Sequence, residues 1–188
     1  QTLLANASRL ARVCSWITGC EVGHWPRGIL HRNIRRGLGY GPATVAVVYS
    51  SHTLEHLYRR EALTFLREVF QILKPGGVCR IVTPDLAAMV GWYLQDRAKP
   101  MDSKAKASSD LMMEMLILRP RDAPRQPNLL EWYRRRTDFH HHKWMYDGEG
   151  LTCLLREAGF TELKTCAYLE SAIPETELAA VERRDRLE

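Results

Sequence analysis

The feature that most constrains the fold is a pair of apolar runs separated by one amphipathic stretch. Val45–Tyr49 is a continuous apolar and β-branched run, as expected of a strand buried on both faces of a parallel sheet. Apolar residues recur at helical spacing from Arg60 to Leu73, Lys74–Gly77 breaks that helix, and Val78–Thr83 gives a second strand. The sequence therefore predicts a βαβ unit, and with it an α/β fold with parallel strands.

Further elements are expected on both sides of this unit. Asp85 is a good N-cap for a helix from Leu86, and Asp147 is one for a last crossover helix that ends at Gly159. The pattern also predicts helices over Gln1–Ile17, Leu111–Leu118 and Leu129–Arg136, and strands over Ile29–Asn33 and Phe160–Leu169. We interpret the chain as one domain. A helix and loop over 1–28 precede a βαβ core over 29–97. A helical insertion or lid over 98–138, a last helix and strand over 139–170, and a tail over 171–188 then follow.

Composition favours a soluble domain with one core. The 188 residues are 45% hydrophobic, and no apolar run approaches the roughly 18 residues that a membrane span needs. The first ten residues do not resemble a secretory signal.

The five cysteines are widely spread without a Cys-x-x-Cys pair, so we expect free thiols and a cytoplasmic protein. The net charge of +5 is interpreted as a solvated basic face rather than a nucleic-acid site.

Several motifs follow one another in a recognisable order. They are Val45–Leu57, Phe65–Val69, Leu73–Val78, His142–Asp147 and Leu151–Phe160. This order, over residues 45–169, resembles class I S-adenosylmethionine-dependent methyltransferases, most closely the methyltransferase type 11 group. The resemblance implies a Rossmann-like fold with a mostly parallel sheet flanked by helices, and S-adenosylmethionine as the cofactor.

The resemblance also implies where the donor binds. In such enzymes the donor lies across the carboxyl ends of the first four strands. Asn33 and Ile34 would then contact the adenine, and Ser50, Ser51 and His52 would lie beside the methionine end. The family's glycine-rich loop should precede Gln1 and its seventh strand should follow the chain, so we expect a fold that is incomplete at both ends. A truncated or degenerate fold that serves as a binding or scaffold module is the alternative to an enzyme.

Two histidines are candidates for proton transfer. Methyl transfer is an in-line displacement that needs alignment and, for some acceptors, a base. His52 follows a central strand and is the first candidate, although it could instead only orient the donor or cap the next helix. His140–His142 precede the last crossover helix, on the same rim according to the resemblance. Among them His142 is the second candidate, and with Trp144 and Tyr146 it would shape an acceptor pocket. The alternative is that Trp144 and Met145 only pack under the helix.

The motif His52-x-x-Glu55-His56 permits one further interpretation. It resembles the Glu-x-x-Glu-His cluster that holds a divalent metal in ubiquinone-biosynthesis O-methyltransferases and small-RNA 2′-O-methyltransferases, with His52 in place of the first Glu. In the RNA enzymes a later histidine completes the site, a role that the resemblance offers here to His140–His142. Imidazole plus carboxylate would suit a borderline metal better than magnesium. A carboxylate and an imidazole near a helix start often only satisfy backbone groups, however. On that ground we expect no bound metal.

The acceptor is expected to be a small or glycan-like molecule rather than a membrane or a nucleic acid. A metal-dependent hydrolase is less well supported, because the His-Glu-x-x-His spacing is absent. Nothing in the sequence favours an NAD-dependent dehydrogenase. Acceptor pockets are made by variable loops, and for this chain they would lie in residues 99–138.

Overall fold

The computed structural model describes residues 30, 32–99, 106–117 and 141–182, and it confirms the α/β class. All the helices and strands it describes belong to one compact unit, Asn33–Glu188. The predicted helices over Gln1–Ile17 and Leu129–Arg136 lie outside the described residues. Within the described part, no helix has the length and apolar character needed to cross a bilayer.

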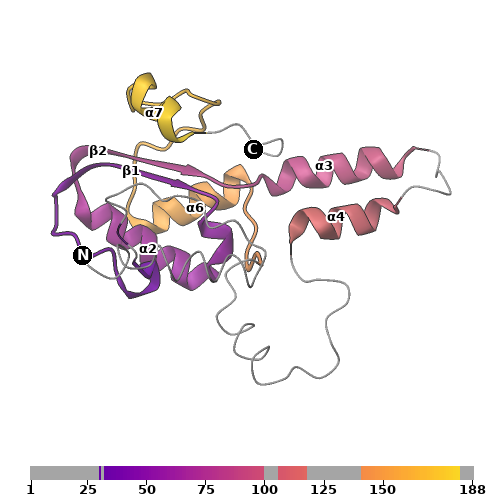
Figure 1. The fold of residues 1–188 in the computed structure, drawn as a ribbon, viewed down its shortest axis with the longest axis horizontal. Coiled ribbons are helices and arrows are strands. Elements are labelled where there is room, and N and C mark those ends of the chain that lie inside the picture. The colour runs from indigo at the N-terminus through magenta and orange to yellow at the C-terminus, as the bar shows by residue number, and fades with distance from the viewer. Residues whose placement is uncertain (1–29, 31, 100–105, 118–140, 183–188) are drawn as a thin grey trace, which may run out of the picture. The chain divides into compact units, whose positions relative to one another are not determined.

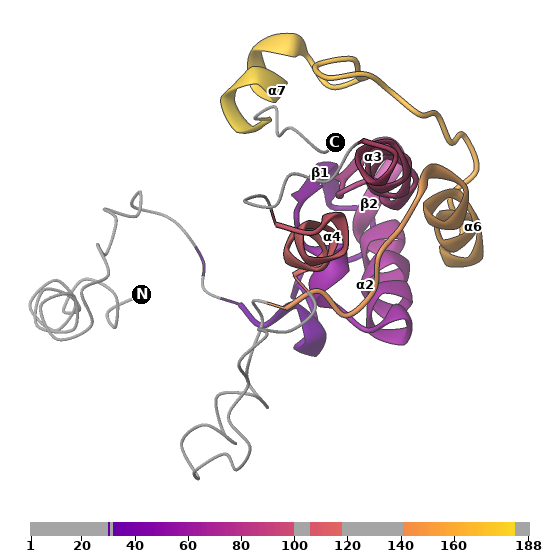
Figure 2. The ribbon, with the colours of Figure 1, turned by 90° about the vertical axis from the view of Figure 1, so that its right-hand side faces the viewer.

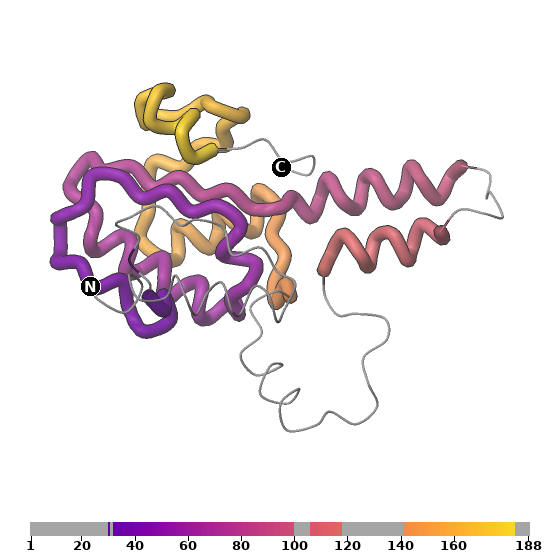
Figure 3. Tube along the Cα trace, viewed as in Figure 1, coloured from indigo at the N-terminus to yellow at the C-terminus, as the bar shows by residue number. Residues whose placement is uncertain are grey.

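The centre of the fold is the predicted βαβ unit (Figure 1). Strand β1 (Val45–Ser51) is followed by the short 3-10 helix η2 (Leu54–His56), helix α2 (Arg59–Ile72) and strand β2 (Leu73–Val82). The two strands pair in parallel. Figure 3 traces the chain along β1, back through α2 and forward again along β2. The carboxyl ends of both strands therefore meet at one edge, which is where open α/β sheets bind ligands.

Strand β2 begins earlier than the sequence predicts. Val45 pairs with Leu73, but Val47 already pairs with Val78, so β2 carries extra residues and the register is interrupted between these pairs. The breaker segment Lys74–Gly77 is accommodated in this bulge instead of lying before the strand.

Gly77 is the tightest position in the bulge. A Cβ atom there would lie 2.9 Å from the backbone oxygens of both Ala46 and Lys74. We expect Gly77→Ala to lower the free energy of unfolding by about 1–3 kcal/mol through overpacking, measured by urea denaturation. Gly91→Ala is the matched control, because a Cβ at this helical position meets nothing within 4 Å. An equal effect of the two substitutions would contradict the account of the bulge.

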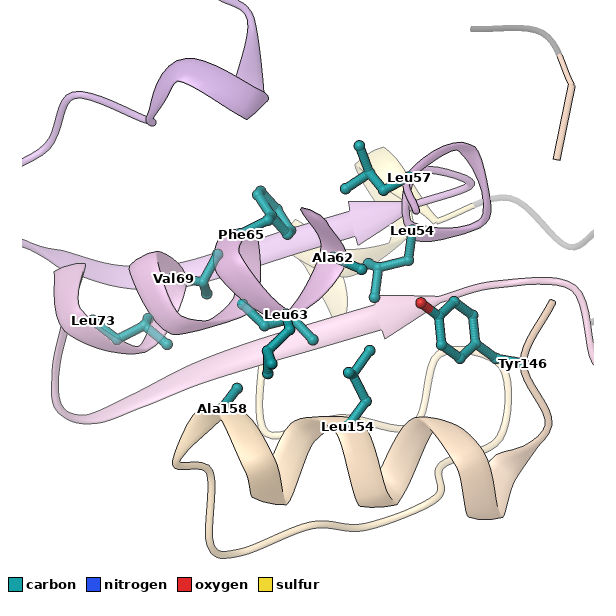
Figure 4. Packing of buried hydrophobic residues seen from close by; sticks show 11 residues of the cluster. Leu54, Leu57, Ala62, Leu63, Phe65, Val69, Leu73, Tyr146, Leu154 and Ala158 are labelled. Atoms are coloured by element: carbon teal, nitrogen blue, oxygen red, sulfur yellow. The ribbon is translucent and has the colours of Figure 1, made fainter. Parts of the chain in front are cut away.

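Helices cover the strand pair. Helix α6 (Gly148–Ala158) packs against α2, and α7 (Glu175–Val181) lies on the other side of the strands from α2 (Figures 1 and 2). Figure 4 shows the core between α2 and α6, where Leu63 faces Leu154 and Ala158. The apolar spacing of both helices thus buries one stripe of each, as predicted.

Other predicted helices are confirmed with their caps. Helix α3 (Leu86–Arg97) begins at Asp85, whose carboxylate accepts a hydrogen bond from Ala87 N at 2.9 Å. Asp147 caps α6 in the same way, through Gly150 N at 2.7 Å. Gly159 ends α6 with φ 111°. Helix α4 (Ser108–Leu116) forms in the methionine-rich segment and packs against α3.

The strand predicted over Phe160–Leu169 is wrong. This segment forms no strand in the structure and fully buries none of its side chains, although Phe160 packs partly buried against the core. Side chains form hydrogen bonds with backbone N–H and C=O groups that would otherwise pair with a neighbouring strand. Glu170 and Glu182 accept from the backbone N of Ala167 and Leu169, at 3.1 and 3.0 Å, and Arg80 donates to Ala167 O at 3.2 Å. The segment therefore contacts Arg80 of β2 without joining the sheet.

The strand predicted over Ile29–Asn33 is also wrong where the structure describes it. Leu30 is exposed, and Asn33 is the N-cap of a 3-10 helix, η1 (Ile34–Arg36). The Asn33 carboxamide accepts a hydrogen bond from Arg35 N at 3.1 Å. Asparagine favours such local bonds to the backbone over strand pairing. The apolar run is too short to outweigh this preference.

The described cysteines Cys79, Cys153 and Cys166 are free thiols, as expected. Burial of Cys79 within β2 raises its pKa from 9.0 to about 12, whereas Cys153 is exposed on α6. Since only the thiolate is nucleophilic, we expect iodoacetamide at pH 8 to alkylate Cys153 at least about 100-fold faster than Cys79. Peptide mass spectrometry over a time course measures both rates, and equal rates in the native protein would contradict the burial of Cys79.

Candidate functional site

The site begins where β1 ends. Ser50 is buried, Ser51 is the last residue of the strand, and His52 N donates a hydrogen bond to Val82 O at 3.1 Å. His52 then takes the left-handed conformation, with φ 48°, which is uncommon for residues other than glycine. This turn moves the chain off the sheet edge, so that His52 lies at the carboxyl ends of both strands.

Glu55 is a fully buried carboxylate in the turn η2. Its exposure is 0%, and its neighbours Leu54 and Leu57 are also buried in the core. Its Oε1 lies 3.3 Å from His52 Nδ1. Among the described residues, neither carboxylate oxygen has a hydrogen-bond partner by geometry. A buried carboxylate with so little compensation is costly, so this position is a candidate for function.

A distant segment, residues 141–146, docks onto η2. Lys143 N donates to Glu55 O at 2.7 Å, and Lys143 Nζ donates to His56 O at 2.9 Å. His142 N donates to Ile117 O, just after α4, at 3.1 Å. The backbone bonds thus fix His142 over η2, where it is buried, with 7% of its surface exposed.

Docking brings the imidazoles of His56 and His142 together. Their ring centroids lie 4.9 Å apart in an edge-to-face arrangement. One potential ligand atom from each of Glu55, His56 and His142 lies within 4.8 Å of the others. We call these three residues the Glu-His-His cluster. His52 adjoins it through Glu55, so the structure brings together both histidines that the sequence analysis proposes as catalytic.

The protonation of two groups is shifted by this environment. The pKa of His142 is lowered from 6.5, first by burial and then by the nearby His56. A hydrogen bond with the backbone of Leu116 opposes this shift, and His52 and His141 add smaller decreases. The pKa of Tyr146 is raised to about 12, mainly by burial, and its hydroxyl points toward Leu54 (Figure 4). At neutral pH His142 is therefore a neutral imidazole and Tyr146 keeps its proton.

The remaining predicted site residues are outside the Glu-His-His cluster or are not described. Asn33 caps η1 and Ile34 is its first residue. This helix packs against α2, and its Arg35 forms an ion pair with Glu61 of α2 at 3.2 Å. His140 lies outside the described residues. Trp144 is half exposed, so the expectation that it packs under α6 is wrong. Met145 is partly buried, and Tyr146 is in the core.

Glu55 is the residue that the sequence analysis undervalued. A carboxylate near a helix start is expected to satisfy backbone groups, but the Glu55 carboxylate makes no such bond to the described residues. The available signal was its place between two leucines, Leu54 and Leu57, that both enter the core.

A family model described as a methyltransferase domain matches residues 6–165. No curated protein and no solved structure matches the chain significantly. The matched range contains β1, β2, α2, α6 and all four residues at the site, His52, Glu55, His56 and His142.

Proposed function

Because the chain belongs to the methyltransferase domain family, we propose that it transfers a methyl group from S-adenosylmethionine to a small or glycan-like acceptor. The family membership supports methyl transfer. The structure supports the place of the reaction, because the parallel pair β1–β2 carries a cluster of chemically active side chains at its carboxyl edge. The contact between His52 and buried Glu55 is the observation on which the proposed chemistry depends.

The donor would lie beside the end of β1. Ser50, Ser51 and His52 would contact its methionine portion, and Asn33 and Ile34 its adenine. Ser51 is partly exposed at the last sheet pair, opposite Val82. Its hydroxyl and the left-handed turn at His52 supply polar groups at an edge where a charged ligand needs them.

His52 would act as the general base toward the acceptor. Its Nδ1 faces Glu55 at 3.3 Å, and a carboxylate on one ring nitrogen fixes the tautomer and leaves the other nitrogen to accept a proton. Glu55 is buried and cannot turn to solvent. His142 is held neutral by its surroundings, and it is the second group that could receive a proton.

The imidazole base and the free thiols bear on the acceptor and on the compartment. An imidazole base suits a hydroxyl or amine of a small or glycan-like molecule, because such groups must lose a proton during the transfer. The free thiols of Cys79, Cys153 and Cys166 support a reducing compartment such as the cytoplasm.

Titration calorimetry with S-adenosylhomocysteine tests the donor assignment on the full chain. We expect binding, and an affinity about 3–10-fold weaker for Ser51→Ala, the value of one lost hydrogen bond. Ser109→Ala in α4 is the matched control and should bind like the parent. A folded protein that binds no S-adenosylhomocysteine at millimolar concentration would overturn the proposed function, and equal affinities of both variants would overturn the place of the donor.

A further inference from the structure

The Glu-His-His cluster also has the ligand types of a metal site. We propose that Glu55, His56 and His142 bind a divalent first-row metal ion, with Zn²⁺ as the best match. The inference stands apart from methyl transfer, because it depends on the three side chains alone and not on a bound donor.

The first argument is the charge of Glu55. Its side chain is fully buried, and an ionised carboxylate in such a place needs a cation or several hydrogen bonds. The expectation of no metal depended on this group satisfying backbone N–H groups. Among the described residues it does not, because both of its oxygens lack a hydrogen-bond donor with acceptable geometry. A bound cation supplies the missing compensation.

His52 does not remove this need. Its Nδ1 is 3.3 Å from Oε1, and more than a third of its side chain is exposed to solvent, at 38%. The contact therefore involves one oxygen and a partner that water also reaches. The carboxylate has lone pairs on both oxygens, so it can contact His52 and coordinate a cation at the same time.

The second argument is the pair of buried imidazole nitrogens. Within the described part of the chain, Nδ1 of His56 and Nδ1 of His142 are both buried without a hydrogen-bond partner. Two unsatisfied nitrogens in adjacent rings are uncommon in a folded core. A metal ion accepts electron pairs from both and from Glu55, and thus accounts for all three unsatisfied groups together.

The third argument is the geometry. The potential ligand atoms of the three residues lie within 4.8 Å of one another, which is close enough for one ion with a small adjustment of rotamers. The backbone is already fixed on both sides, since Lys143 N and Lys143 Nζ bind the carbonyls of Glu55 and His56. Two elements that are tied together in this way hold ligands at constant separation.

The chemistry of the ligands selects the metal. Two imidazoles and one carboxylate suit zinc and its neighbours better than magnesium or calcium, which prefer oxygen ligands. A set of three protein ligands leaves a position for water or substrate. Near His52, such an ion would lower the pKa of a bound acceptor hydroxyl.

Metal binding is tested on the full chain after chelator treatment. Titration calorimetry with Zn²⁺ should show one ion per chain, and Co²⁺ should give the visible absorption of a coordinated ion. We expect Glu55→Gln and His142→Asn to weaken Zn²⁺ at least about 100-fold, more than the loss of an outer-shell partner does. His141→Asn is the matched control, one residue from the cluster, and should bind Zn²⁺ like the parent.

A stability measurement keeps the result interpretable if a variant folds poorly. Saturating Zn²⁺ should raise the unfolding temperature of the parent and of His141→Asn, and should leave that of Glu55→Gln unchanged. Absence of Zn²⁺ and Co²⁺ binding by the folded parent, or equal binding by all variants, would overturn the metal site. Donor binding is measured separately with S-adenosylhomocysteine, so failure of one proposal is distinguished from failure of the other.

Discussion

Replacing Arg80 with Met is expected to lower the free energy of unfolding by about 3–5 kcal/mol, because it leaves a buried carboxylate without its cation. The side chains of Arg80 and Glu182 are only 11% and 2% exposed, and they form an ion pair. Arg80 Nε donates to Glu182 Oε1 at 2.8 Å, and Nη1 donates to Glu170 O at 2.9 Å. One guanidinium on β2 thus fastens the segment that follows α6.

Urea denaturation of the matched variants measures this effect. Arg59→Met breaks an ion pair of the same type with Glu157, but both of those side chains are more than 40% exposed, at 46% and 43%, so the loss should be below about 1 kcal/mol. Adding Glu182→Leu to Arg80→Met should recover part of the loss, since neither charge then remains buried. Equal losses from Arg80→Met and Arg59→Met would show that burial does not set the energy of the pair.

The second large effect concerns His52. On the proposed function, His52→Asn should lower kcat by about 10²–10⁴-fold, the usual contribution of a general base. Asparagine is chosen because it tolerates the left-handed conformation that His52 adopts, with φ 48°. The substitution therefore removes the titrating group with little change to the turn.

Transfer of a labelled methyl group from S-adenosylmethionine to a panel of hydroxylated and amino-bearing small molecules and glycans provides the assay. The control is the affinity for S-adenosylhomocysteine, which should change by no more than a few-fold, together with an unchanged unfolding midpoint. Retention of full kcat by a variant that binds the donor normally would show that alignment alone suffices and that His52 is not the base.

The sequence predicts the central unit well because its signal is local and strong. The run Val45–Tyr49 has no polar side, so it predicts a buried strand, and the observed strand β1 extends it by two residues to Ser51. The expected burial on both faces is wrong, because Ala46 and Val47 are exposed. The caps Asp85 and Asp147 are equally local, because the capping side chain and the backbone N–H that it accepts from are two or three residues apart. The bulge at Lys74–Gly77 depends on how β2 pairs with β1 between Val45 and Val47, so neither strand alone predicts it.

The missed features depend on contacts between distant residues. Phe160–Leu169 has the composition of a strand, but its backbone bonds to Glu182 and Arg80, which lie far away in the sequence. For the candidate site, the sequence identifies His52 and His142 separately. The burial of Glu55 next to His52 depends on the fold, in which Lys143 docks onto the turn that contains it.

The docking of Lys143 on the carbonyl of His56 joins residues that are 87 positions apart. Closing so long a loop costs conformational entropy before any stabilising contact forms. The elements β1, α2 and β2 are neighbours along the chain, so their contacts form with a smaller entropy cost. During refolding the strands and their crossover helix should therefore appear first, and the histidine and glutamate side chains should converge only in the last step. A chain arrested before that step would have native-like secondary structure and no catalytic or metal-binding capacity.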